Sequence, residues 1–208
     1  MSLSTIFRTT LVLTASLGGV AVSPIQAIQL ADGTVSFEKP PSLIKATTTY
    51  NETNVLGATY YFTVELPENA GEPLQRVTIN QRQGVDDIRF KLEDSRAFEG
   101  TPRRKGERLT LSEVTKDPKT GTISLTFDPP VAPGKTVTVG LRPVRNPEIG
   151  GAYIFGVTAF PAGEKPYGLY LGIGRLQFYD NDGDFSIWRL RRQESGGKLS
   201  MSLAPSFN

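Results

Sequence analysis

The sequence of 208 residues contains no cysteine and no histidine. Without cysteine the chain forms no disulfide and carries no acylated cysteine of the lipoprotein type, so packing must stabilise the fold. Without histidine, Ser-His-Asp and Cys-His catalytic systems are excluded, and zinc and copper lose their commonest protein ligand. We therefore expect a protein that is not an enzyme and that needs no cofactor.

Long apolar runs are also scarce. Residues 11–22 form an apolar run that follows Arg8, the first charged residue, and precedes Pro24 and Ala27. A charged start, an apolar stretch of about 7–15 residues and a small residue at the exit are typical of a secretory signal peptide. The run falls short of the roughly 20 apolar residues that span a membrane. The sequence predicts a cleaved signal peptide over 1–27, with an uncleaved anchor as the alternative, and an exported mature chain without a transmembrane segment.

The net charge is small, because 23 Lys and Arg residues oppose 21 Asp and Glu residues and leave +2. The predicted signal peptide holds one charged residue, Arg8, so the mature chain keeps +1. Proteins that bind nucleic acid generally carry a strong basic excess on one face. No nucleic-acid partner is therefore expected.

Alternating apolar and polar residues dominate the rest of the chain. Tyr60, Phe62 and Val64 fall on one face of a strand, and Tyr61 and Thr63 fall on the other. The same pattern recurs at 122–127 and 136–141. Such alternation is typical of strands with one buried face.

Turns rich in glycine and proline separate about eight or nine such segments between residues 43 and 180. Short strands at this spacing favour a sandwich. We predict an all-β chain in which an immunoglobulin-like antiparallel β-sandwich over 28–184, with its core in 43–180, follows the signal peptide. A partly disordered tail over 185–208 completes the chain.

One segment, residues 85–98, fits two kinds of structure. Val85, Ile88 and Leu92 have helical spacing, whereas Ile88, Phe90 and Leu92 alternate as in a strand. We expect a strand followed by a loop.

Three blocks of the sequence stand in a characteristic order and spacing: YYFTVELPENAGEPLQRVTINQ, TISLTFDPPVAPGKTVTVGLRPVRNP and GVTAFPAGEKPYGLYLGIGRLQFYD. Together they resemble the family known as domain of unknown function 2808. The resemblance covers roughly residues 45–180. It implies an exported cyanobacterial protein of the periplasm, thylakoid lumen or outer envelope, and it implies no activity.

The chain also has an early strand that ends in a Val/Leu-Pro step, a Pro-Gly turn in mid-chain and a late Gly-Gly strand. In these features it resembles, more weakly, the YcnI-like exported copper-handling domains, which are also immunoglobulin-like. That family binds copper through an N-terminal histidine exposed by signal cleavage. Cleavage here would expose Ile28, so the residue that carries the family's copper site is missing.

A candidate metal site follows the last predicted strand. Asp180, Asp182 and Asp184 match the first, third and fifth ligand positions of a calcium loop. The sixth position, where such loops need glycine, is Phe185, and the twelfth, where they need glutamate, is Arg191. The alternative is an acidic turn that leaves the strand.

Two further sets of residues are candidates for interaction. Arg103, Arg104 and Lys105 lie in a basic loop that suits anionic polysaccharide, phospholipid headgroups or an acidic protein, although a solvated charged face is the simpler interpretation. Among the aromatic residues, Tyr61, Tyr167 and Tyr170 are the candidates for exposed contacts with sugars or proteins.

The sequence therefore predicts an exported, non-catalytic binding or structural domain that contacts an envelope protein or a polysaccharide. Two alternatives stay open. The first is a domain that depends on calcium or another ion, and the second is a glycan-acting enzyme that uses carboxylates.

Overall fold

The computed structural model describes residues 28–29 and 33–180, so the predicted signal peptide and tail lie outside the described residues. The described part contains strands and no helix. The strands are β1 (Ile28–Gln29), β2 (Val35–Ser36), β3 (Ser42–Thr48), β4 (Tyr60–Glu65), β5 (Leu74–Gln83), β6 (Phe90–Thr101), β7 (Arg104–Leu109), β8 (Leu111–Lys116), β9 (Ile123–Val131), β10 (Thr136–Pro143), β11 (Gly151–Pro161) and β12 (Leu169–Phe178).

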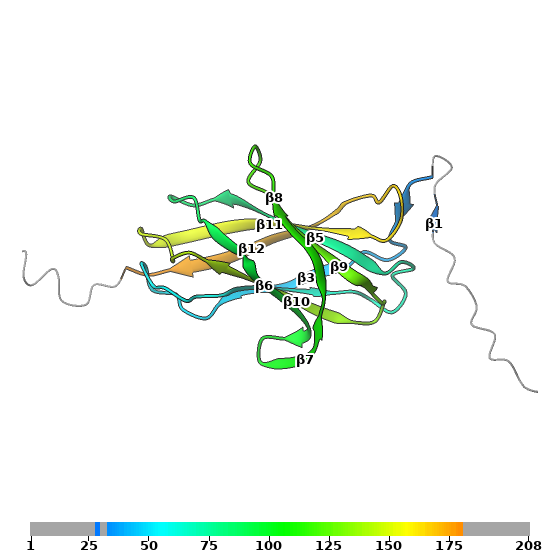
Figure 1. The fold of residues 1–208 in the computed structure, drawn as a ribbon, viewed down its shortest axis with the longest axis horizontal. Helices are drawn as coiled ribbons and strands as arrows, with labels where there is room; N and C mark the ends of the chain where they lie inside the picture. Colours follow the sequence, from blue (N-terminus) through cyan, green and yellow to red (C-terminus); the bar gives the residue numbers. More distant parts are fainter. Residues whose placement is uncertain (1–27, 30–32, 181–208) are drawn as a thin grey trace, which may run out of the picture.

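Ten of these strands form two five-stranded sheets, one with the order β3-β4-β10-β6-β7 and one with the order β12-β11-β5-β9-β8. Neighbouring strands within each sheet are antiparallel. Most strands run along the long axis of the molecule (Figure 1). The prediction of an antiparallel, immunoglobulin-like β-sandwich is confirmed.

Strands β7 and β8 connect the two sheets at one edge. Only Thr110 separates them, yet β7 pairs with β6 in the first sheet and β8 pairs with β9 in the second. In Figure 1 this part of the chain crosses the view nearly at right angles to the other strands. The two sheets are thus joined by a strand that changes sheet, a known way of making a corner in a sandwich.

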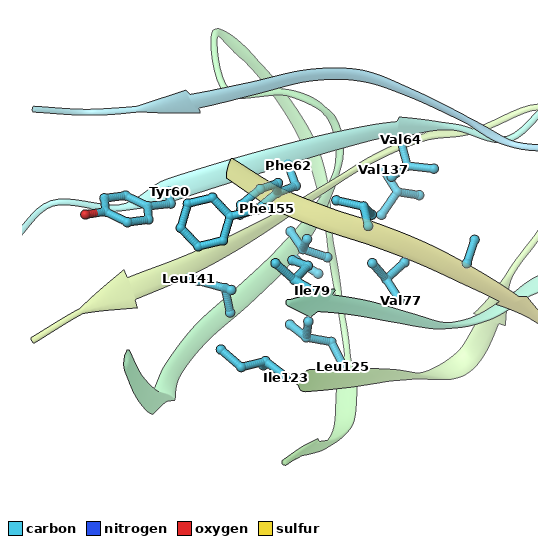
Figure 2. Close-up of a cluster of buried hydrophobic side chains, with 14 of the residues drawn as sticks. Tyr60, Phe62, Val64, Val77, Ile79, Ile123, Leu125, Val137, Leu141 and Phe155 are labelled. Carbon is cyan, nitrogen blue, oxygen red and sulfur yellow. The ribbon is translucent and has the colours of Figure 1, made fainter. Parts of the chain in front are cut away.

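The core lies between the sheets and consists of the inward members of the alternating strands. Tyr60, Phe62 and Val64 of β4 face Phe155 and Val157 of β11, and each of these side chains is at most 1% exposed (Figure 2). The predicted inward rows of β9 and β10 are buried as well. Edge-to-face contacts between the rings of Tyr60, Phe62 and Phe155 add to the packing. The period-two prediction is therefore confirmed for the core.

Two local predictions were wrong. Strand β4 was expected to have one buried face, but Tyr61 and Thr63 on its other face are also buried, because β4 is an inner strand whose outer side chains pack on their neighbours.

The segment 85–98 was expected to be a strand followed by a loop. Instead residues 85–89 form a connection, and β6 then runs without interruption from Phe90 to Thr101. Its pairing with β10 contains a register shift, between the pairs Arg96–Gly140 and Lys91–Arg142.

The loops at one end of the sandwich are joined by hydrogen bonds. We call residues 49–59, 84–89, 144–150 and 179–180 the loop end, which lies at the left in Figure 1. Asn146 is 2% exposed, and its amide nitrogen donates to the carbonyl oxygens of Tyr50 and Glu52 at 3.1 and 2.8 Å. The hydroxyl of Tyr60, which points away from the core cluster in Figure 2, donates to Asn146 Oδ1 at 3.0 Å. This asparagine therefore connects two loops to the core.

A second set of bonds joins the remaining loops of this end. The carboxylate oxygen Oδ2 of Asp86 accepts hydrogen bonds from the backbone N–H groups of Glu148 and Ile149 at 2.7 and 3.1 Å. The hydroxyl of Tyr153 donates to the carbonyl oxygen of Ile149 at 2.9 Å. Asp180 Oδ1 accepts from the N–H of Gly150 at 2.7 Å. The loop end is thus a connected structure.

We predict that Phe155→Ala lowers the free energy of unfolding by about 3–5 kcal/mol, because it leaves a cavity in a core that cannot fully collapse. The measurement is urea-induced unfolding followed by circular dichroism. Ile173→Ala is the matched control, since Ile173 is 59% exposed, and it should change the value by no more than about 0.5 kcal/mol. Similar losses in both variants would contradict the assignment of the core.

We also predict that stability falls at alkaline pH. Burial raises the pKa of Tyr60 and, less strongly, that of Tyr153, and the carboxylate of Asp86 adds to the shift of Tyr153. Above pH ~10 an unfolded tyrosine loses its proton while the folded one keeps it, so the unfolded state binds fewer protons. The free energy of unfolding should then fall by up to about 1.4 kcal/mol per pH unit for each tyrosine.

The check is a series of urea titrations between neutral pH and pH ~11. Tyr60→Phe should give a shallower alkaline decline, and it should cost about 1–3 kcal/mol at neutral pH because Asn146 loses its buried partner. Tyr170→Phe, at a side chain that is 51% exposed, should keep the slope of the unmodified protein. Equal slopes in all three proteins would contradict the prediction.

Candidate functional site

The predicted basic loop is a β-hairpin instead of a loop. Arg104 and Lys105 belong to β7, and Arg103 lies in the turn between β6 and β7. Strand pairing persists to the turn, where Thr101 pairs with Arg104. Gly100, beside a register shift in β6, has a φ of +86°, and a β-carbon there would clash with the carbonyl oxygen of Arg104. The three basic side chains are exposed. The hairpin therefore presents them at the edge of the first sheet.

Tyr61 is not a surface residue. Its side chain is 7% exposed and lies on the outer face of the first sheet, directly across from Gly140 of β10. The ring packs at 6.1 Å from the ring of Phe98, and the Lys105 amine lies 5.8 Å from its centroid. The expectation of an exposed Tyr61 is therefore wrong, since the hairpin covers this ring and a glycine opposite leaves room for it.

Tyr167 and Tyr170 are exposed, by 57% and 51%. The connection that carries Tyr167 is held by β2, because the backbone of Val35 bonds to Lys165 and Tyr167 at 3.0 and 2.8 Å. Tyr170 lies on β12, between Leu169 and a second leucine that pack toward the core, so it points outward. The structure thus separates these two tyrosines from Tyr61, which belongs to the other sheet.

The sequence did not predict that Arg82 lies beside Tyr170 and that two more arginines share its sheet face. Strands β12, β11 and β5 are neighbours, and their only charged residues are Arg76, Arg82 and Arg175. The arginines of β5 alternate with the buried Val77 and with Ile79, so they point outward, as does Arg175 beside the buried Leu176. We call the outward side chains of these three strands the arginine face. It contains no carboxylate.

The arginines of this face lie against aromatic rings. The guanidinium carbon of Arg76 is 4.2 Å from the centroid of Phe160, and that of Arg82 is 6.0 Å from the centroid of Tyr170. Gly156 leaves space beneath the second pair, since a β-carbon there would lie 2.9 Å from Arg82 Nε and 3.2 Å from the Tyr170 ring. These contacts orient both groups without neutralising the positive charge.

No ion pair holds these arginines among the described residues. The ion pairs of that part join Lys135 to Glu99 at 3.0 Å and Arg142 to Asp94 at 3.5 Å, both on the first sheet and its adjoining turn. These arginines thus have no acidic partner in the described part of the chain, and Arg175 donates a hydrogen bond to Gln177 Oε1 at 3.1 Å. The signal in the sequence was the lack of acidic residues in three segments, which becomes informative only when those segments are known to be neighbours.

Of the three aspartates in the predicted calcium loop, one, Asp180, lies within the described residues. Asp180 uses one carboxylate oxygen to accept the bond from Gly150, while Asp182 and Asp184 lie outside the described residues. Within 28–29 and 33–180, no group of three acidic, histidine or cysteine residues is placed to hold a metal ion. Calcium binding by the three aspartates stays a prediction.

One carboxyl group has a raised pKa. Partial burial, followed by repulsion from Glu38, raises the pKa of Glu72 at the end of the sandwich opposite the loop end. The carboxyl lines a shallow hollow of about 440 Å³ together with Val35, Gly163 and neighbouring residues. A raised pKa alone does not define an acid–base pair, and the enzyme alternative has no further support in this hollow.

In the part of the chain that the structure describes, no helix has the length and apolar character of a membrane span. None of the curated proteins matches the sequence. Several solved structures resemble the fold at TM-scores below 0.5.

The collagen-binding domain of a Staphylococcus aureus adhesin is 9% identical with a TM-score of 0.35, and the match covers 66% of this chain and 99% of that chain. The C-terminal domain of the Streptococcus pyogenes antigen I/II-family protein AspA is 14% identical with a TM-score of 0.36, over 65% of this chain and 46% of that one. The collagen-binding subdomain of the Enterococcus faecalis surface protein ACE is 9% identical with a TM-score of 0.34, over 64% and 92%.

A family model agrees with the resemblance carried by the three sequence blocks. It matches residues 34–178, which include both five-stranded sheets and the arginine face. The chain belongs to the family described as "Protein of unknown function (DUF2808)".

Proposed function

We propose that this protein is a non-catalytic binding module that works outside the cytosol and recognises an anionic polysaccharide of the cell envelope. The observation that carries the proposal is the arginine face, where three neighbouring strands carry three arginines and an exposed tyrosine, and no carboxylate. The signal peptide predicted from the sequence supports export to the periplasm, thylakoid lumen or outer envelope.

The chemistry of the arginine face favours anionic sugars. A guanidinium group forms paired hydrogen bonds with a carboxylate or sulfate group, and it is less strongly hydrated than an ammonium group. An exposed aromatic ring such as that of Tyr170 offers a flat apolar surface to a sugar ring. Neighbouring strands lie about 4.8 Å apart, and β11 separates β5 from β12. The positive charges are therefore distributed across the sheet, where they can contact several anionic groups along one polymer.

The structure of the face also favours binding over catalysis. Its side chains stand on three strands whose opposite sides form the core, so their positions are held by packing. The strands carry no acid or base that titrates near neutral pH. A surface of this kind can bind and orient a ligand but has no group to transfer a proton.

We predict that residues 28–208 bind polygalacturonate, an anionic polymer, and do not bind neutral dextran. The double variant Arg82→Ala/Arg175→Ala should lower the affinity by about 10-fold or more, because charge-assisted hydrogen bonds are lost, and Tyr170→Ala should lower it by a smaller factor. Affinity should also fall as salt is raised. Isothermal titration calorimetry measures each quantity.

The matched control is Arg103→Ala/Arg104→Ala, which removes the same charge from the hairpin on the other sheet. It should leave the affinity within about 2-fold, since these side chains do not contribute to the arginine face. Equal losses in both double variants would mean that general charge attraction is responsible. Binding of both polymers alike, or of neither, would overturn the proposed ligand and favour an envelope protein as the partner.

A further inference from the structure

The loop end carries an unusual concentration of exposed apolar side chains. Of the ten large hydrophobic side chains that are exposed in the described residues, six lie there. They are Tyr50 at 50%, Leu56 at 65%, Val85 at 67%, Val144 at 40%, Ile149 at 49% and Tyr179 at 57% exposed. Exposed apolar residues gathered in one place, instead of scattered singly, mark an interaction surface.

The loops that present these side chains are joined to one another. The N–H of Asn54 donates to the carbonyl of Pro147 at 3.0 Å, and that of Asn146 donates to Val55 at 2.9 Å. Together with the bonds of Asp86 and Asp180, these contacts hold the loops in one arrangement. A surface that is ordered before binding loses little conformational entropy when a partner docks.

The loop end also has a negative charge and a groove. Two arginines, Arg89 and Arg145, oppose five acidic residues, which leaves a formal net charge of −3. The acidic residues are Glu52, Asp86, Asp87, Glu148 and Asp180. A groove of about 490 Å³ between loops 84–89 and 144–148 is lined by the exposed Val85 and Val144, by three of these acids and by both arginines. The matching occupant is an apolar segment with positive charge.

The chain itself supplies such a segment at this place. The backbone of Tyr179 is held in the loop end by bonds to Asn51 and Thr53 at 2.8 and 2.9 Å, so the residues that follow Asp180 start from there. Residues 185–192, with the sequence FSIWRLRR, combine four apolar side chains with three arginines and have no acidic residue. They lie outside the described residues.

We propose that the loop end is the docking surface for residues 185–192 of the same chain. The four intervening residues span up to roughly 14 Å, enough to reach the loops beside Asp180. So short a connection gives an effective concentration in the millimolar range, which makes even weak contacts sufficient for docking. An anionic lipid surface is disfavoured as the occupant, because it would face the net negative charge of the loops. This surface is distinct from the arginine face.

Trp188, the only tryptophan of the chain, makes the proposal directly measurable. In residues 28–208 its fluorescence should be blue-shifted and protected from acrylamide quenching, relative to a synthetic peptide of residues 181–194. Protection should be independent of protein concentration. The double variant Leu56→Ser/Val85→Ser should lower the ratio of docked to free segment by about 10-fold, and Asp87→Lys should lower it in the same direction.

Ile173→Ser is the matched control, because it removes an equally exposed apolar side chain from the other part of the molecule. It should leave the fluorescence unchanged, and circular dichroism should show that every variant keeps the same fold. Quenching equal to that of the free peptide would overturn the proposal. Protection that appears only at high protein concentration would assign the surface to a second copy, and protection that appears only with phosphatidylglycerol vesicles would assign it to lipid. Either result would overturn docking within one chain.

Discussion

The contact between two inward rows of apolar side chains is the constraint on which the rest of this structure depends. Tyr60, Phe62 and Val64 on one sheet meet Phe155 and Val157 on the other, in a chain that has no cysteine and so forms no disulfide to assist them. Successive side chains of a strand point to opposite faces of the sheet, so the neighbours of each core residue point to the outer face. The core thereby determines which side chains the protein can offer to a ligand.

The outer faces of the two sheets differ in how far their side chains are covered and paired. On the first sheet, Tyr61 and Phe98 pack beneath Lys105, and the hydroxyls of Thr63 and Thr138 bond to each other at 2.9 Å, so much of this face is closed. On the second sheet, the arginine face carries side chains that have aromatic neighbours but no opposite charge. A charge that is oriented and left unpaired is suited to an external anion, which is why the proposed ligand is assigned to the second sheet.

Two tyrosines of the core form hydrogen bonds with the loop end. Tyr60 and Tyr153 have buried rings, and their hydroxyls bond to Asn146 and to the backbone of Ile149. The order of the loops therefore depends on the packing of the rings beneath them. This connection explains how loops with so many exposed apolar residues keep one arrangement without packing those residues on each other.

Local pattern determined a large part of this protein. Alternation at 60–66, 122–127 and 136–141 was sufficient to predict strands, their inward residues and a sandwich. A strand with one buried face has apolar and polar residues in alternation, and this pattern can be recognised in a short stretch of sequence. It was insufficient where neighbours in space set the outcome. Tyr61 is buried by a hairpin from another part of the chain, and Arg104 and Lys105 belong to a paired strand of that hairpin, with Arg103 in its turn. The arginine face and the loop end were decided by tertiary structure alone. Each gathers segments distant in the sequence, and the charge and apolar character of such a surface exist only after strand order has placed those segments side by side.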